Sequence, residues 1–260
     1  MPDPPKAARL PLSFDPAGLQ SDLAVLGAGE WIAHFNTQFF TGDWSGAALR
    51  SVAGSNNPMY GDASHTDFAD TDLLQQCQHL RAVVEAFACP LRSVRLLRLT
   101  AGSVIREHRD YDLGYELGEV RIHVPVITNP GVQFYLENRR IIMQEGECWY
   151  LDLNLSHRVQ NLGSTDRVHL VIDCQINDWL RALIANGTPS EGSESDYEPF
   201  RRLVLNDTAL QGQLAGLTDR AAFITRTVDL GRQYGFQFEP SDVDGAIQAA
   251  RRAWMERWIV

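Results

Sequence analysis

Residues 94–105 read VRLLRLTAGSVI, and this stretch begins a series of short segments rich in β-branched and aromatic residues. Such segments, each bounded by turn residues, are typical of β-strands. The others are EVRIHVPVIT at 119–128, VQFYLEN at 132–138, RRIIMQ at 139–144, ECWYLDL at 147–153 and RVHLVIDCQI at 167–176. Six or more strands at this spacing predict an antiparallel sandwich or barrel.

Helical periodicity precedes this β region. Residues 13–90 place apolar side chains at the three- and four-residue spacing of an amphipathic helix, so they predict a mostly helical N-terminal layer. A separate helix is expected at 70–88. Residues 41–60 are rich in glycine, serine, asparagine and proline, which is typical of a loop.

A change of composition follows the β region. The segment NGTPSEGSESDY is low in apolar residues and dense in glycine, serine and glutamate, so a linker is expected at 186–199. Residues 200–260 return to helical periodicity and predict a small helical domain. The rest, 1–185, is then one domain that combines the N-terminal helices with the β region.

The composition is that of an ordinary globular protein. The 260 residues are 44% hydrophobic and carry a formal net charge of -10, which disfavours a nucleic-acid partner. No apolar stretch reaches the about 18 residues of a membrane helix, and the N-terminus lacks the apolar core of a signal peptide. We therefore expect no membrane partner and a cytoplasmic location; a homodimer is left open. The four cysteines form no C-x-x-C pair and are expected to pack as reduced thiols.

Three side chains in the β region form a candidate metal site. His108 and Asp110 are two residues apart, so on an extended segment both point to the same side, and His157 follows 47 residues after Asp110. Two imidazoles and one carboxylate on one face of iron(II) leave three coordination positions open, as O2 activation requires. In a chain with seven histidines an HxD tripeptide also arises by chance, so this motif alone does not establish a metal site.

The position of Arg167 supports the interpretation of these residues as a metal site. It lies ten residues after His157, across a short turn and at the start of the next strand. An arginine at the head of a strand as apolar as RVHLVID is costly to bury unless it meets an anion. Its planar guanidinium suits the distal carboxylate of 2-oxoglutarate, which it can bind with two parallel hydrogen bonds. A surface arginine is the ordinary alternative.

Other cationic residues repeat the same spacing. Arg121 and His123 are two apart and share one face of their strand, where they could serve the carboxylates beside the iron. Arg95 and Arg98 are candidates for binding a carboxylate of the substrate. His169 either lines the cavity or is a core histidine.

With these residues placed, the chain resembles the aspartyl/asparaginyl β-hydroxylase family of iron(II)- and 2-oxoglutarate-dependent oxygenases. The resemblance runs from Val94 to Cys174, through RLLRLTAGSVIREHRD, VRIHVPVITNPGVQFYLEN and GECWYLDLNLSHRVQNLGSTDRVHLVID. Within the family it is closer to the bacterial cis-proline hydroxylases, which share an arginine thirteen residues before the first iron histidine, here Arg95. The fold implied is α+β: a double-stranded β-helix, or cupin-like jelly roll, with an N-terminal helical layer and a C-terminal helical appendage.

The resemblance also implies roles for individual residues. His108, Asp110 and His157 would be the iron ligands, Arg167 would bind the distal carboxylate of 2-oxoglutarate, and Arg121 with His123 would lie around the iron-side carboxylates. The vertebrate β-hydroxylase has glycine where this chain keeps Asp110, which favours the small-amino-acid branch of the family. Where that enzyme uses a serine to help hold 2-oxoglutarate, this chain has Leu97.

The tail carries a second resemblance. Residues 205–247, with the turn GFQFEPSDV, resemble a small helical domain that is associated with nitrogen-fixation operons and serves as a leader region in some ribosomal peptide precursors. Three amphipathic helices with an aromatic turn are also what a generic helical cap looks like.

The sequence therefore predicts an iron(II)- and 2-oxoglutarate-dependent dioxygenase that uses O2. It would hydroxylate an amino acid, or an amino-acid residue of a peptide, of the Pro, Asp or Asn type, with succinate and CO2 as co-products. The alternative is a non-catalytic, cupin-like protein that binds or senses a small anion and uses its helical tail to bind a partner.

Overall fold

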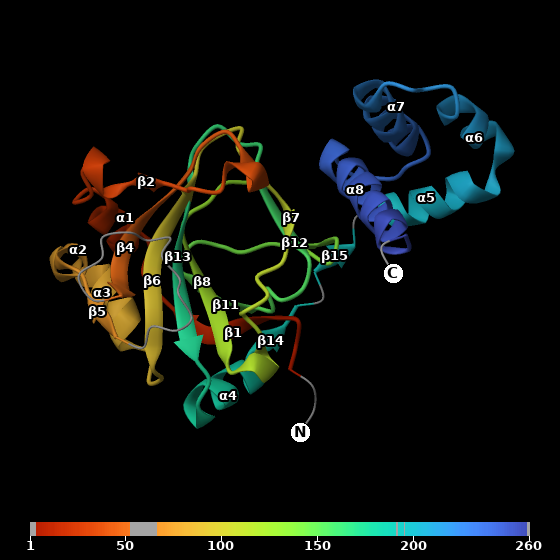
Figure 1. Ribbon diagram of the computed structural model, residues 1–260. Helices are drawn as coiled ribbons and strands as arrows, with labels where there is room; N and C mark the ends of the chain where they lie inside the picture. Colours follow the sequence, from red (N-terminus) through yellow and green to blue (C-terminus); the bar gives the residue numbers. More distant parts are fainter. Residues whose placement is uncertain (1–3, 53–66, 191, 195, 259–260) are drawn as a thin grey trace. The chain divides into compact units, whose positions relative to one another are not determined.

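The computed structural model describes residues 4–52, 67–190, 192–194 and 196–258 (Figure 1). The chain folds into two compact units. We call Met1–Glu137 with Ile141–Gly192 the β unit, and Asn138–Arg140 with Ser193–Val260 the helical unit.

The β unit contains a large antiparallel sheet, in the order β14-β1-β11-β8-β13-β6-β4-β2, with β5 paired to β4. Its strands are β1 (Ala7–Ser13), β2 (Ile32–Ala33), β4 (Trp44–Val52), β5 (Phe68–Asp70), β6 (Leu91–Leu99), β8 (Glu119–Ile127), β11 (Glu147–Leu151), β13 (Arg167–Gln175) and β14 (Thr188–Pro189). The order places β8, β13 and β6 side by side at its centre, so the cationic segments recognised in the sequence are neighbours in space.

A smaller antiparallel sheet faces it. Within the β unit its order is β9-β12-β7-β3. These strands are β3 (Phe40–Thr41), β7 (Val104–His108), β9 (Val132–Leu136) and β12 (His157–Asn161). Side chains of both sheets, such as Leu99 and Leu151 of the large one and Ile105 and Phe134 of the small one, form one buried cluster between them. Two facing antiparallel sheets confirm the predicted double-stranded β-helix.

The outer face of the large sheet is covered by helices. They are α1 (Pro16–Leu23), α2 (Asp72–Gln76), α3 (Gln78–Glu85) and α4 (Asp178–Ala185), which share a second core with the sheet. Strand β13 contributes to both faces, because Leu170 and Ile172 belong to this outer core, whereas Arg167 and Asp173 line the interior cavity. This follows from strand geometry, in which successive side chains point to opposite faces.

The N-terminal region is less helical than its periodicity predicts. The helix expected at 70–88 is present as α2 and α3, but residues 28–41 form two short 3₁₀ helices, η1 (Ala28–Glu30) and η2 (Thr37–Phe39), and the strands β2 and β3. Phe35 there is 74% exposed and is not part of a buried helical face.

The loop expected at 41–60 is also wrong for its first half. Residues 44–52 form β4, a long strand between β6 and β2, and its small residues Ala47 and Ala48 are buried. Pairing along both edges stabilises the strand although its own composition resembles a loop. Residues 53–60 of the expected loop lie outside the described residues.

The helical unit has its own core. Its helices are α5 (Tyr197–Asn206), α6 (Thr208–Leu214), α7 (Arg220–Gln233) and α8 (Pro240–Glu256), which pack around Phe200, Leu230 and Val243. At its start β10 (Arg139–Ile141) pairs with β15 (Ser193–Glu194). Within the described part of the chain, no helix combines the length and the apolar character required to cross a bilayer.

Candidate metal centre and its cavity

The three predicted metal ligands meet where two strands of the small sheet begin and end. His108 is the last residue of β7 and His157 the first residue of β12, and the two are partners in the antiparallel pairing of these strands. Asp110 follows on a loop whose backbone is fixed by a hydrogen bond from its own N–H to the carbonyl of Leu153, at 2.9 Å. The result is one group in which the ligand atoms of all three residues lie within 4.8 Å of one another.

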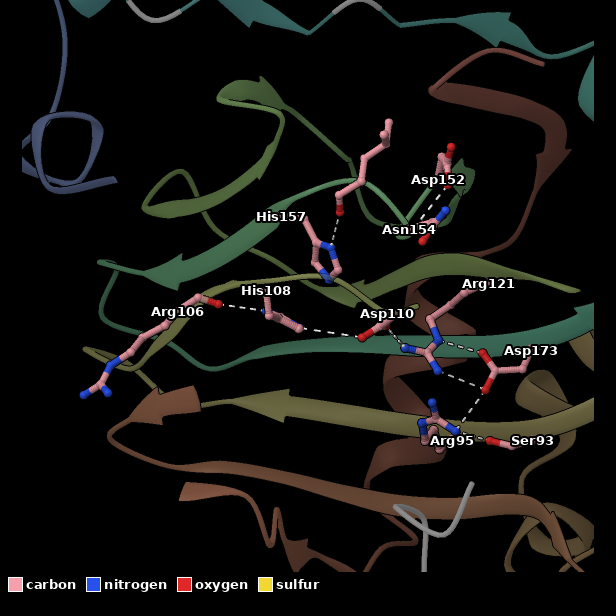
Figure 2. Close-up of polar contacts among 11 residues, drawn as sticks. Ser93, Arg95, Arg106, His108, Asp110, Arg121, Asp152, Asn154, His157 and Asp173 are labelled. Carbon is pink, nitrogen blue, oxygen red and sulfur yellow. Dashed lines mark hydrogen bonds and ion pairs between the residues drawn. The ribbon is translucent and has the colours of Figure 1, made fainter. Parts of the chain in front are cut away.

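Both histidines are oriented for metal binding. His108 Nδ1 lies 2.8 Å from the carbonyl oxygen of Arg106, and His157 Nδ1 lies 3.0 Å from that of Leu155 (Figure 2). A carbonyl oxygen only accepts hydrogen bonds, so Nδ1 carries the proton in each ring. The lone pair of each Nε2 is then free to bind a metal ion. Metal-bound histidines typically have this tautomer and donate their other ring N–H in this way.

His157 is in addition held in its neutral form. It is 4% exposed, and burial, followed by the neighbouring His108, lowers its pKa to about 4. A neutral imidazole is the form that binds a metal ion.

The group opens onto a cavity of about 490 Å³ inside the β unit. Arg167 and His123 line it together with apolar side chains such as Leu97 and Phe134. Arg167 is 2% exposed, and burial lowers the pKa of its guanidinium. Its Nη2 lies 2.9 Å from His169 Nδ1, while its Nε and the Nε2 atoms of both His123 and His169 are buried without a hydrogen-bond partner.

The charge of Arg167 is not compensated by an acid within the described residues, where no carboxylate pairs with it. A buried guanidinium left in this state is costly unless an anion from solution joins it. The site therefore suits the carboxylate of a bound ligand.

Two other arginines of the cavity, Arg121 and Arg95, pair with carboxylates of the protein. Arg121 donates from Nε and Nη2 to the two oxygens of Asp173, at 2.6 and 3.1 Å, and from Nη1 to Asp110 Oδ2 at 2.6 Å. Arg95 lies 3.2 Å from Asp173 and also contacts Ser93. Figure 2 shows this chain of contacts from His108 to Arg95. Burial alone would raise the pKa of Asp173, but the two arginines lower it to about 2.

The cavity gathers most of the residues singled out in the sequence. His108, Asp110, His157, Arg167, Arg121, His123 and Arg95 all line it. Arg98 does not, because it is three residues after Arg95 on the same strand and faces the other way, with its guanidinium 4.4 Å from the centre of the Trp31 ring. His169 is fully buried beside Arg167 rather than in the cavity wall.

Asp173 is the site residue that the sequence reasoning missed. It shares its strand parity with Arg167, six residues earlier, so both belong to the inner face of β13. An acidic residue in a strand as apolar as VHLVIDC was the available signal, because a buried carboxylate requires cationic partners.

Comparison with known proteins gives a consistent set of matches. Residues 41–176 match the family model described as Aspartyl/Asparaginyl beta-hydroxylase. The chain is 28% identical over 207 residues to the L-proline cis-4-hydroxylase of Rhizobium meliloti (strain 1021), which covers 78% of this chain and 72% of that protein. It is 23% identical over 259 residues to an L-proline cis-3-hydroxylase 2 of Streptomyces sp, with coverage of 96% and 89%.

Among solved structures, an oxidoreductase of the 2OG-Fe(II) oxygenase family from Burkholderia pseudomallei is similar at a TM-score of 0.40 and 15% identity, covering 67% of this chain and 81% of that one. The range matched by the family model contains the metal group and the three arginines Arg95, Arg121 and Arg167.

Proposed function

The chain belongs to the aspartyl/asparaginyl β-hydroxylase family, and from that premise we propose that it hydroxylates a free amino acid of the proline, aspartate or asparagine type. The reaction is that of a 2-oxoglutarate-dependent dioxygenase. The curated relatives that match most of the chain are proline hydroxylases, which supports a small substrate with an α-carboxylate.

His108, Asp110 and His157 would hold iron(II). The fit rests on their donor set and on the two outer hydrogen bonds that leave each Nε2 free for the metal. The chemistry that iron(II), 2-oxoglutarate and O2 supply together when bound is hydroxylation of a C–H bond, with succinate and CO2 as co-products. The protein's part is to position the substrate carbon and to exclude water.

Arg167 would bind the distal carboxylate of 2-oxoglutarate. Its buried Nε without a partner and the unpartnered Nε2 of His123, both at residues that line the cavity, are groups that only a ligand or water could satisfy. A carboxylate there would convert an uncompensated buried charge into a charge-assisted pair. The apolar wall around it, with Leu97 and Phe134, would keep water away from that pair.

Arg95 would bind the carboxylate of the substrate. It lines the same cavity and is held in place by Asp173 and Ser93 through a single nitrogen, Nη1, so other guanidinium N–H groups are available to a ligand. Arg98, the other candidate from the sequence, does not line the cavity, because its guanidinium lies over the ring of Trp31.

One observation carries the proposal: a histidine–aspartate–histidine group at a cavity that also contains a buried arginine with which no carboxylate of the described residues pairs. A non-catalytic anion-binding protein would use the arginine but not the group of three ligands, so that alternative is disfavoured.

The test is a screen of the twenty amino acids, each with protein, iron(II), 2-oxoglutarate and O2, for succinate release above the substrate-free rate. Mass spectrometry would then identify a product with one added oxygen atom. We expect one or a few free amino acids to be hydroxylated. Succinate release that no free amino acid increases would contradict the proposal.

A further inference from the structure

The two oxygens of Asp110 lie in different surroundings. Oδ1 faces the metal group, 3.9 Å from His108 Nε2, whereas Oδ2 accepts a 2.6 Å hydrogen bond from Arg121. Figure 2 shows the carboxylate between the imidazole on one side and the guanidinium on the other. The arginine therefore occupies the oxygen that the metal would need in order to bind Asp110 through both.

Arg121 is in turn held from behind. Its Nε and Nη2 form a two-pronged pair with Asp173, and the two residues are directly opposite each other on the neighbouring strands β8 and β13. Arg95, on the other neighbour of β13, fixes the same carboxylate from a third strand. Asp173 is thus held by arginines of both neighbouring strands at the centre of the large sheet, and its pairing with Nε and Nη2 of Arg121 directs Nη1 towards Asp110.

We propose that Asp173 is a positioning residue for the metal centre. By holding Arg121, it reserves Asp110 Oδ2 for the guanidinium and leaves Oδ1 alone to the metal. This inference rests on the proposed function. A carboxylate that binds through one oxygen leaves three positions free for the co-substrate and O2, whereas a carboxylate bound through both would close one of them.

Asp173 also has an electrostatic effect. Arg121 brings a positive charge within hydrogen-bond distance of a metal ligand, and that charge competes with the metal ion for Asp110. The carboxylate of Asp173, at 2.6 Å from the same guanidinium, offsets this charge. Without it, Asp110 would be the main acidic partner of Arg121 and a poorer ligand.

The two residues should therefore affect metal affinity in opposite directions. We would measure cobalt(II) binding by its visible absorption, without 2-oxoglutarate or substrate, in the wild type, Asp173→Asn, Arg121→Met and the double variant. Asp173→Asn is expected to bind cobalt roughly 10- to 100-fold more weakly, the range typical of outer-sphere partners. Arg121→Met is expected to bind cobalt at least as tightly as the wild type, and its spectrum should change because the second oxygen of Asp110 can also bind the metal. The double variant should have the same affinity and spectrum as Arg121→Met.

Asp22→Asn is the matched control. Asp22 is also a buried carboxylate, bonded to the backbone N–H of Leu80 and to His79, but it does not line the cavity. This variant should bind cobalt as the wild type does.

The positioning role is overturned if Asp173→Asn binds cobalt like the wild type, or if Arg121→Met weakens binding as much as Asp173→Asn does, since that is what general damage to the site would produce. If Asp173→Asn does not fold, the spectrum of Arg121→Met decides, and an unchanged spectrum overturns the role. Absence of cobalt binding by the wild type would instead remove the metal assignment and the proposed function with it.

Discussion

Arg167 and Arg121 are both buried on the inner face of the same sheet, but their surroundings differ. Burial disfavours the charge of Arg121, yet two carboxylates of the chain contact it and raise its pKa. Arg167 lies 2.9 Å from His169 Nδ1, no described carboxylate pairs with it, and burial lowers its pKa. The buried charge of Arg121 is therefore compensated inside the protein, whereas no described carboxylate compensates that of Arg167, which we propose binds a ligand.

The largest expected effect concerns the metal group at the same cavity. His157→Ala should abolish substrate-dependent succinate formation, because two ligands on one face cannot replace the set of three. His79→Ala changes a histidine that pairs with Asp22, away from the cavity, and should retain turnover. Succinate formation by His157→Ala at the wild-type rate would remove the metal assignment.

Arg167→Leu should raise the KM for 2-oxoglutarate on the order of 100-fold, because truncating one partner of a buried charge pair costs several kcal/mol. The kcat at saturating co-substrate should change much less. Arg98→Leu, which removes an arginine outside the cavity, should leave the KM for 2-oxoglutarate unchanged. An equal rise in both variants would mean that Arg167 has no special role in binding.

Substitutions at the two arginine sites should also differ in their effect on the free energy of unfolding. Asp173→Asn leaves two buried arginines without their shared carboxylate and should lower the free energy of unfolding by about 3–5 kcal/mol. Arg167→Leu removes a charge that has no acidic partner and should cost no stability in the absence of ligand. The measurement is urea unfolding of both variants without 2-oxoglutarate. If Arg167→Leu loses as much free energy of unfolding as Asp173→Asn does, Arg167 is paired inside the protein.

The smallest expected effect is on the pH dependence of stability. The pKa of Asp173 falls from its ordinary value of 3.8 to about 2 on folding, so its ionised form contributes about 2 kcal/mol of stability. That contribution is complete above pH 3.8 and is lost as the pH falls towards 2. The difference in unfolding free energy between the wild type and Asp173→Asn should therefore shrink as the pH is lowered through this range; a constant difference would mean that the carboxylate is not stabilised by its arginines.

The sequence predicted the β region, which depends on local patterns, and it singled out His108, Asp110 and His157, whose ligand atoms lie within 4.8 Å of one another in the structure. Alternation on strands places residues two apart on one face, as for Arg121 and His123 on β8, which both line the cavity. Local composition failed for β4, whose small residues are held in a strand by the neighbours on both sides. Arg98 lies outside the cavity because it is three residues after Arg95 on one strand, whereas residues two apart share a face.

Contacts between residues on different strands could not be predicted from the sequence. The contact between Asp173 and Arg121 depends on which strands are neighbours and in which register, and one sequence does not give that. The domain limits 1–185, 186–199 and 200–260 stay predictions; the structure divides the chain near Gly192, and α5 already begins at Tyr197. The likeness of the tail to a leader-type domain, the cytoplasmic location and a homodimer also stay predictions.

An anaerobic titration of the protein with iron(II), followed by 2-oxoglutarate and monitored by visible absorption, tests the metal group and Arg167 together. If both act as proposed, a charge-transfer band forms that requires both additions, is absent in His157→Ala, and needs a much higher 2-oxoglutarate concentration in Arg167→Leu. No band in the wild type, or a band of equal strength and affinity in both variants, would contradict this assignment.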